Sequence, residues 1–170
     1  MRPIDAGLGP DIISGMVEVP PEPVRLRDFP SEYPHQKDLG NRRRRMLSPY
    51  RYTFEHGGVQ WRITVPIDFE HDGASVPGIT WSFYRPHSLD ASAVLHDWLY
   101  RHQGRTPVAS QERRIGDDWI LTTKTWTRKE ADQIFRTCLK MDPNGPSAVK
   151  RWAAYRAVRL GGGAAWRKKG

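Results

Sequence analysis

The sequence predicts an α+β fold in which an N-terminal extended arm, a β-hairpin and a three-helix core follow one another. Two segments of alternating polarity flank a pair of glycines, which is typical of a hairpin. Further along the chain, apolar side chains recur at helical spacing after helix-capping residues. The first 49 residues are instead rich in proline. A chain of 170 residues is most often one domain, so we expect a single folded unit.

The arm is predicted over residues 1–49, which hold eight of the 14 prolines. Proline removes a backbone donor and fixes φ, so long helices and central strands are not expected here. The folded domain is predicted to cover residues 50–166. Residues 167–170 then form a short basic tail.

The hairpin is predicted at residues 50–56 and 59–65, where apolar and polar side chains alternate. Gly57 and Gly58 lie between the two segments and suit a tight turn, because glycine adopts positive φ without strain. Residues 103–118 are polar and are predicted to form a loop. Residues 119–121 are predicted to form a short strand after it.

Three helices are expected to complete the domain, over residues 89–102, from 127 to the proline at 143, and over 147–161. Ser88 or Asp90 is the expected N-cap of the first helix. The second helix begins with a capping box, Thr127-Arg-Lys-Glu130. We expect the first two helices to pack antiparallel.

A set of polar side chains on these two helices carries the functional interpretation. His96 and Tyr100 are four residues apart and therefore share one face of the first helix. If the helices are antiparallel, Asp132 meets both of them. A carboxylate on one imidazole nitrogen stabilises the imidazolium, and the other nitrogen is then free to take a proton from water. His96, Asp132 and Tyr100 are therefore the candidate catalytic residues.

A cation site is predicted beside this set. Asp97 is rotated by about 100° from its neighbour on the helix, so it faces a different part of the fold. Carboxylate and carbonyl oxygens bind hard cations. The turn that begins Asp72-Gly-Ala-Ser is compact enough to supply carbonyl oxygens. The candidate metal ligands are Asp97, Asp72, Gly73 and Ser75.

The alternative hypothesis is that the same side chains form a polar network without chemistry. A histidine can be a satisfied core residue, and a tyrosine is a good core residue. Asp132 near a helix N-terminus is favourable because of the helix dipole alone. Polar groups on apolar helices need one another as partners in either case.

The charge of the chain points to anionic partners. The formal net charge is +8, and such a balance favours nucleic acid, anionic phospholipid or acidic protein surfaces. Arg42, Arg43, Arg44 and Arg45 form the densest basic run and are the candidate nucleic-acid contacts. Solvated surface charge is the alternative explanation.

Cellular location is constrained by what the sequence lacks. Cys138 is the only cysteine, so no internal disulfide can form. No apolar run approaches the ~20 residues that span a bilayer. The first residues also lack the apolar core of a signal peptide. We therefore expect no transmembrane segment, no signal peptide and assembly in a reducing interior.

Three motifs, taken together, resemble a known family. The segments Asp72-Gly-Ala-Ser-Val-Pro77, His96-Asp-Trp-Leu-Tyr100 and Ala131-Asp-Gln-Ile-Phe135 occur in this order. The pattern is similar to a phage and prophage family known as domain of unknown function 1353. This resemblance implies a viral or prophage origin. The proline-rich arm, the run Arg42–Arg45 and the basic tail favour a virion-associated protein of the tail or head–tail region. It would be assembled in the host cytoplasm as part of an oligomeric structure, with other virion proteins as its partners.

The His96-Asp97-x-x-Tyr100 segment also resembles the active site of secreted phospholipases A2. The resemblance implies a calcium-dependent ester hydrolase with His96 as the base, Asp97 as a Ca²⁺ ligand and Asp132 as the group that orients His96. Anionic phospholipid is then a further partner. The turn at residues 72–75 has to replace the glycine- and cysteine-rich calcium loop. The alternative is a purely structural virion component.

Overall fold

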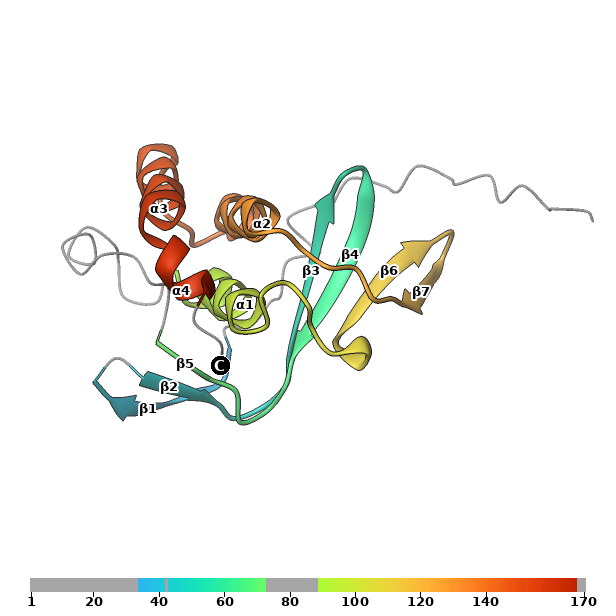
Figure 1. Cartoon of the computed structure of the whole chain (residues 1–170), viewed down its shortest axis with the longest axis horizontal. Helices are drawn as coiled ribbons and strands as arrows, with labels where there is room; N and C mark the ends of the chain where they lie inside the picture. The colour runs from blue at the N-terminus through green and yellow to red at the C-terminus, as the bar shows by residue number, and fades with distance from the viewer. Residues whose placement is uncertain (1–33, 42, 73–88, 168–170) are drawn as a thin grey trace, which may run out of the picture.

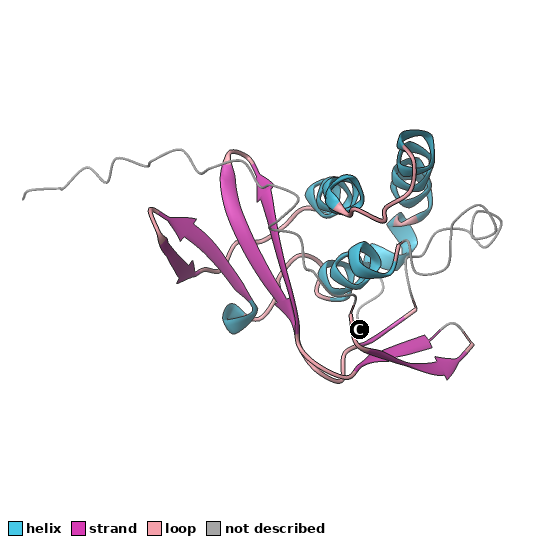
Figure 2. Cartoon of the chain, turned by 180° about the vertical axis from the view of Figure 1, so that it is seen from behind, coloured by secondary structure: helices cyan, strands magenta, loops and turns pink. Residues whose placement is uncertain are grey.

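A computed structural model describes residues 34–41, 43–72 and 89–167. These residues form two antiparallel sheets and four α-helices, which confirms the predicted α+β class. The helices lie together on one side of the larger sheet, and the smaller sheet lies below them (Figure 1). Seen from behind, the same strands and helices remain separated into these groups (Figure 2).

The larger sheet has the order β3-β4-β6-β7. The predicted hairpin is confirmed: β3 (Tyr50–His56) pairs antiparallel with β4 (Val59–Val65) around the two glycines. Alternate side chains of this hairpin point into the core, so that Tyr52, Phe54 and Ile63 are fully buried. The alternation in the sequence therefore marks the face that the helices cover.

The prediction of a loop over residues 103–118 is wrong. A 3-10 helix (Val108–Ser110) leads into β6 (Gln111–Ile115), which pairs with β4 and with β7 (Asp118–Leu121). The strand β6 was not predicted because its sequence is polar and lacks the alternation of apolar residues that indicates a strand. Gln111 is nevertheless fully buried, because its side chain donates to the Lys124 carbonyl and accepts from the Trp126 indole. Strand pairing and these bonds override the weak local preference.

The smaller sheet has the order β1-β2-β5. Its strands are β1 (Gln36–Gly40), β2 (Arg43–Met46) and β5 (Glu70–His71). Residues 36–46 fall in the predicted arm, where no central strand was expected, yet β2 is central in this sheet. Met46 is fully buried in the main core, so the folded unit begins before residue 50.

Residues 89–167 contain four α-helices, with β6 and β7 between the first two of them. They are α1 (Asp90–Arg101), α2 (Arg128–Met141), α3 (Ala148–Gly161) and α4 (Gly163–Arg167). Among residues 34–41, 43–72 and 89–167, none of the helices is long and apolar enough to cross a bilayer.

The N-caps of α2 and α3 are the predicted residues, whereas the N-cap of α1 is not. The capping box of α2 is present in full, with Thr127 and Glu130 bonded to each other's backbone N–H. Ser147 precedes α3 as predicted. Leu89 holds the N-cap position of α1 without a side-chain bond, and Asp90 is the first helical residue rather than the cap. Ser88 lies outside the described residues.

Helices α1 and α2 pack side by side in opposite directions. Tyr100 bonds Asp132, whereas His96, one turn earlier in α1, contacts Phe135, which lies later in α2. A later residue of α1 thus contacts an earlier residue of α2. The two helices are therefore antiparallel, as the sequence predicted. This antiparallel contact brings the polar faces of the two helices together.

Backbone hydrogen bonds of Gly104 connect the C-terminal end of α1 to the segment that precedes α2. Its N–H donates to the Leu99 carbonyl at 2.8 Å, and its carbonyl accepts from the Trp126 N–H at 3.0 Å. The residue has φ +75°, and a Cβ there would overlap the backbone of Trp126. Only glycine allows this close approach.

Replacement of Gly104 by alanine is therefore expected to lower the free energy of unfolding by at least about 3 kcal/mol, because a backbone overlap is added to left-handed strain. Gly116→Ala is the matched control. Gly116 also has a positive φ of +58°, but a Cβ there would meet nothing within 4 Å. It should cost only about 1–2 kcal/mol. Urea unfolding measures the loss of unfolding free energy in both variants. Equal losses would contradict the proposed role of the close approach between Gly104 and Trp126.

Candidate functional site

Helices α1 and α2 bring the three predicted catalytic side chains together. His96 Nε2 lies 3.0 Å from Asp132 Oδ1, and the Tyr100 hydroxyl donates to the same oxygen at 2.6 Å. His96 and Tyr100 share one face of α1 because they are four residues apart. Asp132, the fifth residue of α2, faces them. The spacing in the sequence thus predicted the contact.

Arg159 on α3 completes the surroundings of this carboxylate. Its Nη1 donates to Asp132 Oδ2 at 2.6 Å, and its carbonyl accepts from Arg128 at 3.2 Å. Arg159 was not among the site residues predicted from the sequence. The helical period of α3 gives the face of each of its basic residues, but it does not reveal which one reaches the buried carboxylate of another helix.

Asp132 is held in its charged form. Its side chain is 0% exposed. Burial alone would raise the pKa of Asp132, but hydrogen bonds from His96, Tyr100 and Arg159 outweigh burial and lower the pKa below its ordinary value. A buried carboxylate with three donors, two of them cationic when His96 is protonated, is a stable arrangement.

His96 lies between two carboxylates. Its ring packs against Tyr100 and Phe135, with centroid distances of 4.1 and 4.9 Å, and the residue is only 1% exposed. Nε2 meets Asp132, and Nδ1 lies 3.8 Å from Asp97 Oδ1. Burial lowers the pKa of His96, but the two carboxylates outweigh it, so the net pKa is raised.

The second imidazole nitrogen differs from the prediction. We expected Nδ1 of His96 to be open to water, but it is buried and has no hydrogen-bond partner among the described residues. The orienting half of the predicted arrangement is therefore present. In this conformation, the solvent-facing half is not.

Tyr100 keeps its proton and acts as a donor. Burial and the negative charge of Asp132 raise the pKa of Tyr100 far above its ordinary value. Its ring packs edge-on against Trp166 with centroids 5.0 Å apart. Gly162 permits this approach of the chain after α3, because a Cβ there would come within 2.5 Å of the Tyr100 hydroxyl.

Asp97 connects the site to the smaller sheet. Its Oδ2 lies 3.7 Å from Nδ1 of His71, a buried residue of β5, and has no hydrogen-bond partner among the residues described. His71 Nε2 is 2.7 Å from Gln36 Oε1 on β1. The sequence analysis missed His71 because no spacing rule links a two-residue strand to a helix.

The predicted cation ligands are placed in part. Burial, followed by the negative charge of Asp97, raises the pKa of Asp72, so these two carboxylates lie close together. Gly73 and Ser75 lie outside the described residues. Within the described ranges, no group of three or more His, Cys, Asp and Glu side chains is arranged to hold a metal ion. Asp97 and Asp72 are the described residues that would hold Ca²⁺ here, since carboxylate oxygens are its usual ligands, and further oxygens would have to complete the shell.

The comparisons with known proteins identify a family. A family model described as "Protein of unknown function (DUF1353)" matches residues 44–158. The chain belongs to this family. A comparison with curated proteins found no match, and a comparison with solved structures found none. The matched region of this DUF1353 member runs from β2 into α3 and includes His96 and Asp132, whereas Arg159 follows its last residue.

In this DUF1353 member, the geometry orients the ring of one histidine. Asp132 fixes Nε2 and stabilises the imidazolium, as carboxylates do in acid–base sites. The other ring nitrogen, Nδ1, is buried on the side of Asp97. His96 accepts a proton only when it is neutral, that is, above its raised pKa.

The contribution of His96 to stability is expected to fall as pH rises. Because its folded-state pKa is raised above 6.5, this contribution is fully present below pH 6.5 and is lost as pH rises through the raised pKa. Urea unfolding of wild type and His96→Gln at several pH values measures it. The difference in unfolding free energy should shrink on the alkaline side.

His102→Gln is the control for this prediction. Burial and nearby Arg101 lower the pKa of His102, so its difference from wild type should change with pH in the opposite direction. A wild-type minus His96→Gln difference that does not vary between roughly pH 5 and 9 would contradict the raised pKa.

Proposed function

We propose that this protein is a calcium-dependent ester hydrolase in which His96 is the general base and Asp132 orients it. One observation carries the proposal: Asp132 Oδ1 meets both His96 Nε2 at 3.0 Å and the Tyr100 hydroxyl at 2.6 Å, while Asp97 lies beside the other imidazole nitrogen. The contacts among His96, Asp132 and Tyr100 are those that the phospholipase A2 resemblance implies, whereas the water-facing imidazole nitrogen that it also implies is buried here. Phospholipid is accordingly the substrate class to test first.

The proposed roles follow from the contacts. His96 Nδ1 accepts a proton from water as that water attacks the ester carbonyl carbon, and the imidazolium then returns the proton to the leaving alkoxide as the ester C–O bond breaks. Asp132 stabilises the imidazolium, and Tyr100 and Arg159 hold Asp132 in place. Ca²⁺ held by Asp97 and Asp72 would stabilise negative charge on the carbonyl oxygen. Water must displace the Nδ1–Asp97 contact of 3.8 Å to reach its position.

A second candidate function is a structural role in which the same side chains form a non-catalytic network. The burial of His96, which is 1% exposed, and of its Nδ1 favours this alternative. Replacement of His96 or Asp132 would then lower the free energy of unfolding and change no catalytic rate. The two candidates differ in one measurable quantity, which is turnover.

Hydrolysis is tested by release of fatty acid from phospholipid vesicles, with Ca²⁺ or with a chelator. We expect wild type to be active only with Ca²⁺. His96→Gln should lose at least about 100-fold of the rate, because a general base contributes about 10²–10⁴. Asp97→Asn should require more Ca²⁺. Circular dichroism checks that each variant is folded.

His102→Gln and Asp117→Asn are matched controls for these variants. His102 caps the end of the same helix, and the Asp117 side chain is fully exposed on another part of the chain. Both should keep wild-type activity. Equal rates in wild type and His96→Gln, or no activity in wild type, would rule out the hydrolase and leave the structural network.

We further propose that the protein is a component of a phage or prophage particle, at the tail or head–tail region, with other virion proteins as partners. The order of the three motifs supports this origin. Mass spectrometry of purified particles from a lysogen that encodes the chain should detect it in a fixed ratio to the tail proteins. Its absence from the particles would contradict the proposed location.

A further inference from the structure

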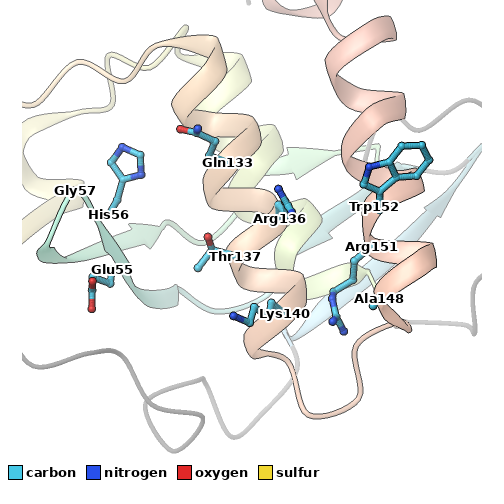
Figure 3. A pocket seen from close by; sticks show the side chains of 10 residues that line it. All are labelled: Glu55, His56, Gly57, Gln133, Arg136, Thr137, Lys140, Ala148, Arg151 and Trp152. Atoms are coloured by element: carbon cyan, nitrogen blue, oxygen red, sulfur yellow. The ribbon is translucent and has the colours of Figure 1, made fainter.

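A pocket of about 590 Å³ lies on the outer side of α2, away from the His96 site. The turn between β3 and β4 forms one wall and α3 forms the other, with α2 between them (Figure 3). Most of its lining side chains are polar or charged. They are Glu55, His56, Gly57, Gln133, Arg136, Thr137, Lys140, Ala148, Arg151 and Trp152.

The pocket gathers positive charge that no carboxylate of the described residues neutralises by an ion pair. Arg136 and Lys140 are one turn apart on α2, and Arg151 lines the pocket from α3. Within the described part of the chain, none of the three has a carboxylate at ion-pair distance. Glu55 is the single acidic residue of the lining. This pocket therefore attracts an anion.

The basic run singled out in the sequence behaves differently. Arg43 and Arg45 both pair with Glu70 on the neighbouring strand. Their charge is partly used within the smaller sheet, and Arg42 lies outside the described residues. The pocket on α2 is thus a better candidate for an anionic partner than the run of arginines.

An aromatic ring borders the same pocket. Trp152 is 57% exposed, although large aromatic side chains are usually covered. The guanidinium carbon of Arg156 lies over one face of the Trp152 ring, 5.8 Å from the ring centroid, which adds a further cation here. An exposed indole among cations offers a surface on which a nucleobase can stack.

We propose that this pocket binds single-stranded nucleic acid, with phosphates at Arg136, Lys140 and Arg151 and a base stacked on Trp152. Single strands expose the faces of their bases, whereas a duplex does not. A flat bilayer would not enter a recess between a hairpin and a helix. The inference does not depend on the hydrolase, because none of the residues around His96 lines the pocket.

Fluorescence anisotropy of a labelled oligothymidylate of about 12 nucleotides, with the full chain, tests the proposal. Arg136→Gln/Lys140→Gln should weaken binding at least about tenfold. It should also make the slope of log K against log salt shallower by about 1.4, or about 0.7 for each lost phosphate contact. Trp152→Ala should weaken binding about tenfold through lost stacking, while Trp152→Phe should restore most of it.

Lys37→Gln/Arg105→Gln is the matched control, because it removes the same charge from exposed positions outside the pocket. It should bind nearly as well as wild type. Three results would overturn the proposal: no binding by wild type, an equal loss in the control, or binding to anionic phosphatidylglycerol vesicles but not to the oligonucleotide. Circular dichroism confirms that each variant is folded.

Discussion

The buried carboxylate of Asp132 is the group on which the arrangement of the helices depends. It sits on α2 and accepts hydrogen bonds from His96 and Tyr100 on α1 and from Arg159 on α3. A fully buried carboxylate without partners would cost several kcal/mol, so the three helices must meet at this point. These bonds connect α1, α2 and α3 at one buried point.

The same constraint gives His96 its chemical character. Asp132 on one side and Asp97 on the other favour the imidazolium, although burial disfavours it. Asp97 in turn lies between His96, His71 and Asp72. A cation held there would weaken the hold of Asp97 on His96 and favour the neutral imidazole. Structure and proposed chemistry thus share one set of contacts.

Much of this site could be predicted from the sequence because its geometry is local. The four-residue spacing of His96 and Tyr100 fixes a shared helix face, and the capping box at Thr127 fixes where α2 begins. Arg159 and His71 could not be found in this way. Each reaches the site from an element whose position depends on tertiary packing, which no periodicity encodes.

In the sheets too, the strands with a local sequence pattern could be predicted, and the strands that depend on distant partners could not. The β3–β4 hairpin follows from alternation and a glycine turn, both of which are local. The strand β6 is polar and is defined by its pairing with β4, and β2 lies in a proline-rich segment that reads as an arm. In both cases, partners distant in the sequence decide the conformation.

Ionised Asp132 raises the pKa of His96, and an NMR titration of the His96 ring measures this effect. In wild type, the pKa of His96 should lie above the ordinary 6.5. In Asp132→Asn, burial remains while the charge is lost, so the pKa should fall by at least about one unit. A His96 pKa that is the same in both proteins, or that lies below 6.5 in wild type, would contradict the account.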